Sequence, residues 1–325
     1  MPVAASVVSF VVTFIALRAL LSRFAAFALD RPNERSLHKD PVPRTGGLAI
    51  VLGTGAGFSL GAGSLWLPAA CALFLAAVSL IDDLRSLPTL ARLAAHLLAS
   101  TLVAWYLLSP MAAFELALVV LAVVWLSNLY NFMDGADGLA GGMALFGFGA
   151  YALAAWMVDH QALATFCAAL AAAAAAFLIF NFHPARIFLG DVGSVPAGFL
   201  AGALGIVGWR DDAWPLWFPL LVFAPFIGDA TLTLVKRLLR RERVWQAHRE
   251  HYYQRMVRMG LGHRRTALVA YALMAICAGA ALYGRGEVPQ MQAAMFAGTA
   301  VLLAAVAVWV DLRWMRHRRT AGNSA

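Results

Sequence analysis

The sequence has little charge and few cysteines. Only 13% of its 325 residues are charged and 62% are hydrophobic, which gives a mean hydropathy of +0.74. A typical soluble domain is about 25% charged, so this shortage excludes a water-soluble globular enzyme and a disordered scaffold. The cysteines, Cys71, Cys167 and Cys277, lie far apart in apolar stretches, which excludes a disulfide framework and a cysteine zinc site. The composition therefore predicts an integral membrane protein.

The apolar residues form stretches of the length that a membrane-spanning helix requires. About 20 apolar residues cross the hydrocarbon core, and fewer suffice where neighbouring helices shield the segment. Eleven stretches meet this criterion, namely 3–28, 47–62, 66–81, 93–109, 112–129, 139–158, 161–180, 194–209, 214–236, 265–283 and 288–312. We therefore expect an all-α, polytopic transmembrane helical bundle that forms one domain over residues 1–325.

The basic residues predict how this bundle is oriented. Most of them lie in loops on one side, including Arg44 and the basic loop 236–265, whereas the opposite loops hold only Arg210 and Arg285. Cytoplasmic loops are the ones enriched in Lys and Arg. We expect a periplasmic N-terminus and a short cytoplasmic tail over 314–325. The net charge of +8 therefore sets topology, and no nucleic-acid partner is expected.

Acidic and amide side chains gather at the predicted cytoplasmic ends of the spans. An aspartate at the centre of a membrane helix costs about 2.5–3.5 kcal/mol, so aspartates that border spans are candidates for function. The residues concerned are Asp82, Asp83, Asn128, Asn131, Asp134, Asp137, Asn181 and Asp191. Basic loops flank them, as expected where carboxylates hold Mg²⁺ and arginines hold phosphates. A nucleotide-diphosphate substrate fits this combination.

Two glycine-flanked segments carry most of these groups. From Asn128 to Asp137 the polar residues recur every three positions, so in a straight helix the first faces away from the last. Gly135 and Gly138 are expected to break the helix. A helix cap is the simpler alternative for Asp137, and also for Asp191 or Ser194 in the segment 188–194. We favour a binding role, because a helix cap alone would not explain why several further acidic residues lie at the same side of the membrane.

The basic loop 236–265 contains His248 and His251, followed by two tyrosines. Histidines three residues apart share a helix face, where they bind phosphate, relay protons or ligate metal. A zinc site is disfavoured because no further Cys or His lies at ligand spacing. The alternative is that the basic residues only fix the topology and attract anionic lipid.

Together the motifs resemble the polyprenyl-phosphate N-acetylhexosamine-1-phosphate transferases, a bacterial family of membrane glycosyltransferases (family 4). The matching segments are Arg35-Ser36-Leu37-His38, Pro43 to Gly47, Asp82-Asp83, Asn128 to Gly138, Asn181 with Phe188 to Ser194, and the histidine loop. The resemblance implies transfer of a sugar-1-phosphate from a UDP-sugar to undecaprenyl phosphate, with release of UMP. It further implies Mg²⁺, or Mn²⁺ in its place, and a site that faces the cytoplasm at the bacterial inner membrane.

The resemblance also implies roles for individual residues. The metal would be held by Asp191 and Asn131, and the catalytic groups would be Asp82, Asp83, His248 and His251. The substrate-binding residues would be Arg44, Arg85, Asn128, Asp134, Asp137, Asn181 and Phe188. We prefer direct attack of the lipid phosphate, with one of the paired aspartates as base, over a phosphoryl-enzyme on one of these carboxylates.

The sugar and the pathway remain open at this point. The loop reads His-Arg-Glu-His-Tyr-Tyr, whereas peptidoglycan-type members carry consecutive histidines and common-antigen-type members carry His-x-His-His. This pattern favours the branch that initiates O-antigen or a related envelope glycan, using an N-acetylhexosamine or a deoxy-N-acetylhexosamine. A phospho-N-acetylmuramoyl-pentapeptide transferase is the alternative within the family, and a transporter is the alternative from another class. A homodimer is left open.

Overall fold

A computed structural model describes the chain except residues 24–28, 31–36, 38–40, 245, 247 and 323–325. The helices are α1 (Pro2–Arg23), α2 (Gly46–Phe58), α3 (Trp66–Arg85), α4 (Thr89–Leu108), α5 (Ala113–Phe132), α6 (Leu139–Trp156), α7 (Gln161–Asn181), α8 (Asp191–Arg210), α9 (Trp217–Val222), α10 (Ala224–Leu239), α11 (Tyr252–Met256), α12 (Gly262–Gly284) and α13 (Pro289–Gly322). Two short helical segments, η1 (Gly63–Leu65) and η2 (Val257–Leu261), precede α3 and α12. Strands β1 (Leu29–Asp30) and β2 (Val42–Pro43) pair antiparallel.

The all-helical membrane architecture is confirmed. Among the described residues, nine helices are long and apolar enough to cross a membrane. Two of the eleven expected spans differ from this pattern: 47–62 forms the 13-residue helix α2, and 214–236 is divided at Phe223 into α9 and α10. The number of spans and their orientation in the membrane therefore stay predictions.

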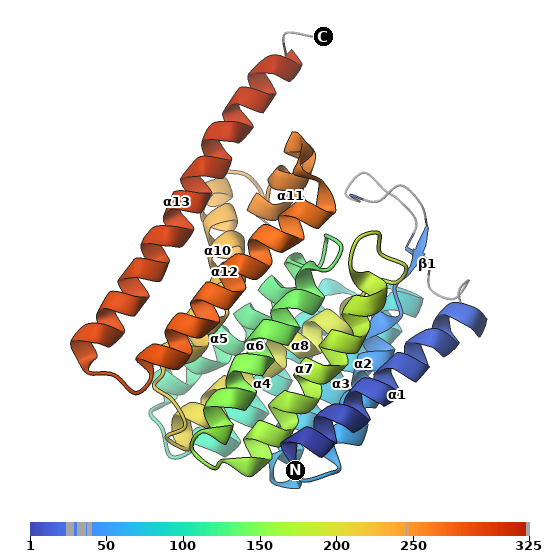
Figure 1. Ribbon diagram of the computed structural model, residues 1–325, viewed down its shortest axis with the longest axis vertical. Helices are drawn as coiled ribbons and strands as arrows, with labels where there is room; N and C mark the ends of the chain where they lie inside the picture. Colours follow the sequence, from blue (N-terminus) through green and yellow to red (C-terminus); the bar gives the residue numbers. More distant parts are fainter. Residues whose placement is uncertain (24–28, 31–36, 38–40, 245, 247, 323–325) are drawn as a thin grey trace.

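The helices pack into a bundle around α8. Of the nine long helices, α8 is the most enclosed and α13 the least. The neighbours of α8 are α2, α3, α4 and α5, and α6 packs closely on α7. Figure 1 shows α13 along one side of the molecule, with its C-terminal part projecting beyond the other helices. The α11 segment and β1 lie at that same end, whereas the N-terminus lies at the opposite end (Figure 1).

The segments 236–265 and 314–325, which the sequence predicts to lie outside the spans, contain helical residues. The predicted loop 236–265 contains the end of α10, all of α11 and η2, and the start of α12. The predicted tail 314–325 continues α13 as far as Gly322. The position of both segments relative to the membrane stays a prediction.

Candidate functional site

The helix that carries the long polar motif breaks where the glycines predict. Helix α5 ends at Phe132 and α6 begins at Leu139, and Gly138 between them has φ +76°, which favours glycine. The cap position of α6 is Gly138, without a side-chain cap, and the Asp137 carboxylate instead accepts the Ala185 N–H at 3.1 Å. The helix-cap alternative for Asp137 is therefore wrong.

The two asparagines of this motif point to different neighbours. The Asn128 amide donates to the Val124 carbonyl at 2.7 Å and lies 3.3 Å from His96 Nδ1, on α4. The Asn131 amide oxygen accepts the Ser194 hydroxyl at 2.8 Å, on α8. Of the two, Asn131 is thus the one directed at the glycine-flanked segment that begins α8.

Asp191 is the first residue of α8 and does not cap it. The cap position is Gly190, with φ +70°, and no side chain caps the helix. The Ser194 hydroxyl is also no cap, because it donates to the Gly190 carbonyl at 3.1 Å. The Asn131 side chain lies close to the Asp191 carboxylate. The two residues predicted to hold the metal are therefore neighbours, and the cap alternative is wrong here too.

The paired aspartates at the end of α3 share their arginine partners with Asp191. Electrostatic interactions join Asp191 to Asp82, Arg44 and Arg92. Asp82 Oδ2 lies 3.0 Å from Arg92 Nη1, and Asp83 Oδ1 lies 3.3 Å from Arg44 Nη2. The Asp82 side chain is 12% exposed and the Asp83 side chain is 6% exposed. Each of these largely buried carboxylates thus has an arginine partner. This arrangement places three carboxylates and two guanidinium groups at one end of the bundle.

Arg92 is a site residue that was not predicted from the sequence. Helix α3 ends in a left-handed Ser86, with φ 50°, and the chain turns so that Arg92 on α4 reaches back to Asp82. The predicted Arg85 is exposed, and no ion pair of Arg85 is found within the described part of the chain. Its role in substrate binding stays a prediction. The sequence feature that could have indicated Arg92 is its position in the first turn of α4, directly after the loop that follows Asp82 and Asp83.

The motif from Pro43 to Gly47 and the motif that begins at Phe188 are connected by backbone hydrogen bonds. The Phe188 N–H donates to the Pro43 carbonyl at 2.7 Å, and the Gly46 N–H donates to the Phe188 carbonyl at 2.9 Å. The Gly47 N–H then donates to the Leu189 carbonyl at 2.8 Å. Arg44 and Phe188 are therefore held on neighbouring segments. Of the preceding motif, Arg35, Ser36 and His38 lie outside the described residues.

Asn181 joins the loop after α5 to the loop after α7. Its amide oxygen accepts the Gly138 N–H at 2.9 Å, and its amide nitrogen donates to the Ile187 carbonyl at 2.9 Å. The residue is only 4% exposed. Both the oxygen and the nitrogen of the Asn181 side-chain amide form hydrogen bonds with the backbone. Asn181 therefore positions the two loops that carry Asp134, Asp137 and Phe188. Direct contact of these residues with a nucleotide stays a prediction.

Asp137 is surrounded by two histidines that were not among the predicted site residues. His183 Nδ1 lies 2.6 Å from its Oδ2, and His263 Nδ1 lies 3.3 Å from its Oδ1. Burial by itself raises the pKa of Asp137, but the hydrogen bonds from His263 and His183 outweigh it and hold the pKa at about 2. Asp137 is therefore a carboxylate at neutral pH.

The histidine loop is held against the same loops by Asp229 of α10. The Asp229 carboxylate accepts the Tyr252 N–H at 2.8 Å and the Tyr253 N–H at 3.0 Å, and its Oδ1 lies 3.3 Å from His251 Nδ1. The Tyr253 hydroxyl in turn donates to the Phe132 carbonyl at 3.1 Å, at the end of α5. Asp229 was not among the predicted site residues, because its partners follow it by more than 20 positions.

His248 and His251 lie together, with their ring centroids 4.8 Å apart. Burial, followed by the proximity of His251 and Arg237, lowers the pKa of His248 to about 4. His248 is thus neutral at pH 7 and does not act as a fixed cation. The catalytic role of this half-buried histidine stays a prediction.

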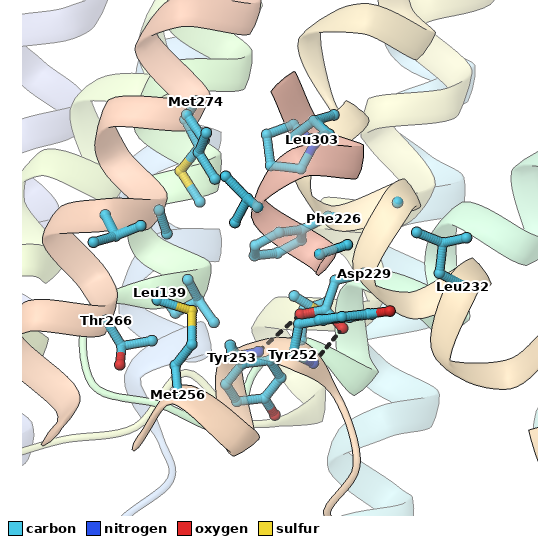
Figure 2. A pocket seen from close by; sticks show the side chains of 18 residues that line it. Leu139, Phe226, Asp229, Leu232, Tyr252, Tyr253, Met256, Thr266, Met274 and Leu303 are labelled. Atoms are coloured by element: carbon cyan, nitrogen blue, oxygen red, sulfur yellow. Dashed lines mark hydrogen bonds between the residues drawn. The ribbon is translucent and has the colours of Figure 1, made fainter. Parts of the chain in front are cut away.

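An apolar cavity lies below this loop, between α10, α12 and α13. Its lining is almost entirely hydrophobic, including Phe226, Met274 and Leu303. Figure 2 shows Asp229 at its polar end, with dashed lines to the backbone of Tyr252 and Tyr253. The cavity therefore combines a hydrophobic interior with one end beside the histidine loop.

Comparison with known proteins gives one family. The model of glycosyl transferase family 4 matches residues 65–209. The chain is 31% identical to the decaprenyl-phosphate N-acetylglucosaminephosphotransferase of Mycobacterium tuberculosis, over 91% of this chain and 84% of that protein. It is 29% identical to the probable undecaprenyl-phosphate N-acetylglucosaminyl 1-phosphate transferase of Bacillus subtilis, over 76% of this chain and 74% of that protein.

A shorter match covers a smaller part of the chain. It is 41% identical to the phospho-N-acetylmuramoyl-pentapeptide-transferase of Halalkalibacterium halodurans, over 30% of each protein. The longer matches agree with the clustered carboxylates and arginines of the site. The chain therefore belongs to the polyprenyl-phosphate N-acetylhexosamine-1-phosphate transferases of glycosyl transferase family 4, and it is a glycosyl-1-phosphate transferase.

Proposed function

We propose that this enzyme transfers an N-acetylhexosamine-1-phosphate, or its deoxy form, from a UDP-sugar to undecaprenyl phosphate and releases UMP. The observation that carries the proposal is the cluster of Asp82, Asp83 and Asp191 with Arg44 and Arg92. Both substrates are anionic, so their reaction requires cations to offset the repulsion between phosphates. Relatives named for undecaprenyl- and decaprenyl-phosphate acceptors support a lipid phosphate as acceptor.

The donor set fits a magnesium ion. Asp191 supplies a carboxylate beside the Asn131 amide, and Mg²⁺ commonly takes one or two protein oxygens while it keeps waters and substrate phosphates. The Asn131 oxygen now accepts from Ser194, so a rotation of the amide would direct it to a cation. When bound, the ion would neutralise charge on the pyrophosphate of the donor.

Direct transfer is the mechanism that we prefer. Both oxygens of Asp82 are engaged, one by the Leu87 N–H at 2.6 Å and one by Arg92. We assign the base to one of this pair, Asp82 or Asp83, which takes the remaining proton of the lipid phosphate. A lipid phosphate oxygen then bonds to the sugar-linked phosphorus, the bond from this phosphorus to the bridging oxygen of UDP breaks, and UMP leaves. Arg44 and Arg92 stabilise the charge on the phosphates.

The prenyl chain of the acceptor is assigned to the apolar cavity of Figure 2. Hydrocarbon gains free energy by contact with its hydrophobic lining, and the polar end of the cavity lies beside His251. We place the enzyme in the bacterial inner membrane with this end toward the cytoplasm, and assign it to an initiating step of O-antigen or related envelope glycan synthesis. The absence of consecutive histidines at 248–251 argues against the pentapeptide-bearing donor.

The test is UMP release by the purified protein with Mg²⁺ and undecaprenyl phosphate. The donors are UDP-N-acetylglucosamine, UDP-N-acetylfucosamine and UDP-N-acetylmuramoyl-pentapeptide. We expect release with one of the first two donors and its loss with a chelator. Release with the pentapeptide donor alone overturns the proposed substrate, and release with none contradicts the donor class. A burst of UMP without acceptor overturns direct transfer in favour of a phosphoryl-enzyme.

A further inference from the structure

Three side chains outside the proposed magnesium site converge from separate segments. Asp137 lies in the loop after α5, His183 in the loop after α7, and His263 in the first turn of α12. One ligand atom of each, a carboxylate oxygen or an imidazole nitrogen, lies within 4.8 Å of the other two. The two imidazole rings are stacked, with centroids 5.5 Å apart and planes 6° apart. Such convergence of two histidines and a carboxylate is typical of a metal site.

The surroundings orient these ligands. Asp137 Oδ2 also accepts the Ala185 N–H at 3.1 Å, which fixes the carboxylate. His263 Nε2 lies 3.4 Å from the Leu37 carbonyl, and its Nδ1 lies 3.2 Å from the Asp137 backbone nitrogen and 3.3 Å from Asp137 Oδ1. Metal-binding histidines commonly have such a partner on the second ring nitrogen.

The donor set also indicates which ion it would take. Imidazole nitrogen suits zinc and other transition metals, whereas magnesium prefers oxygen ligands. Three protein ligands leave one position of a tetrahedral site for water or another ligand. The His183 side chain is 41% exposed, so this position is open to solvent.

We propose that Asp137, His183 and His263 bind a divalent transition-metal ion, with Zn²⁺ as the preferred probe, at a site distinct from the proposed magnesium site. The bound ion cross-links the loops that follow α5 and α7 to the start of α12. These are the loops that Asn181 already joins through the backbone. The ion therefore stabilises the segments around Phe188.

The test is Zn²⁺ binding by tag-free, full-length protein in detergent, measured by equilibrium dialysis and by the shift in melting temperature. Co²⁺ provides a spectroscopic check, through the visible absorption of a tetrahedral site. We expect saturable Zn²⁺ binding and a raised melting temperature in the wild type. We expect both to be lost in His183→Asn and in His263→Gln. The asparagine at 183 keeps a hydrogen-bond donor for Asp137, so that the fold is preserved while a strong ligand is removed.

His160→Gln is the matched control, because His160 also contacts an aspartate, Asp211, at 2.8 Å but at the other end of the bundle. We expect this variant to bind Zn²⁺ as the wild type does. Absence of saturable Zn²⁺ binding in folded wild-type protein overturns the proposal, and so does unchanged binding in folded His183→Asn and His263→Gln. These measurements need no donor sugar, so their outcome is independent of the proposed transfer reaction.

Discussion

Replacing Asp229 with asparagine tests whether this residue holds the histidine loop in place. The carboxylate is 9% exposed and accepts the N–H groups of Tyr252 and Tyr253, one on each oxygen. Asparagine has nearly the same shape, but only one of its two polar ends is an acceptor. One backbone N–H therefore loses its partner, and the other loses an ionised acceptor.

The expected loss follows from the strength of such bonds. A hydrogen bond to a charged group contributes about 1.5–3 kcal/mol. A loss of this size raises the equilibrium for opening of α11 roughly 10- to 150-fold, since 1.4 kcal/mol corresponds to a factor of ten. Because α11 carries Tyr253 and follows His251, opening separates both residues from the end of α5. We therefore expect a lower kcat together with the more frequent opening.

Hydrogen exchange measured by mass spectrometry reports the opening directly. Exchange at the Tyr252 and Tyr253 amides should accelerate by the same factor in Asp229→Asn, while kcat for UMP release falls. Thr233→Val is the control, because it removes only the 3.3 Å contact of the Thr233 hydroxyl with the Asp229 carboxylate. If both amides exchange at the wild-type rate in a folded Asp229→Asn protein, the assigned role is refuted. If exchange accelerates while kcat is unchanged, the position of α11 does not affect the reaction.

Three further changes test other parts of the site. Asp191→Asn should abolish Mg²⁺-dependent UMP release while folded protein persists in the membrane; normal release removes Asp191 from the metal site. Asn181→Ala should lower the melting temperature, because the Gly138 N–H and the Ile187 carbonyl lose buried partners at about 1–3 kcal/mol each; an unchanged melting curve contradicts this. The pKa of His248 is lowered to about 4 in the folded protein, whereas it is about 6.5 in an unfolded chain. Between these two pH values the unfolded chain therefore binds a proton that the folded chain does not. The free energy of unfolding should thus fall as the pH falls through this range. His248→Gln should reduce this pH dependence of the melting temperature, and an identical dependence in both proteins disproves it.

The positions of the glycines allowed the central geometry of the site to be predicted. Gly138 interrupts the helix as expected, and the segment that begins α8 meets the end of α5 through Asn131 and Ser194. These features follow from local backbone preference and from the cost of placing acids within a membrane. The same reasoning overestimated the regularity of the spans, since Phe223 divides the ninth.

The residues that were missed depend on turns and on contacts distant in sequence. Arg85 and Arg92 are equivalent by composition, but the left-handed turn at Ser86 directs the second toward Asp82. His183 and His263 approach Asp137 from positions 46 and 126 residues away. No periodicity or local motif encodes such distances, because packing of α7 and α12 around α6 determines them.

The turn after α5 and the tyrosine that follows the histidines are fitted to each other. A methyl group on Gly135 would come within 2.2 Å of the Tyr253 hydroxyl, which real contacts do not permit. Any enlargement at 135 therefore has to be accompanied by a shorter side chain at 253, and the Tyr253→Phe change would provide part of that room. The loop after α5 and the loop that carries the histidines are therefore constrained to change in step at these two positions.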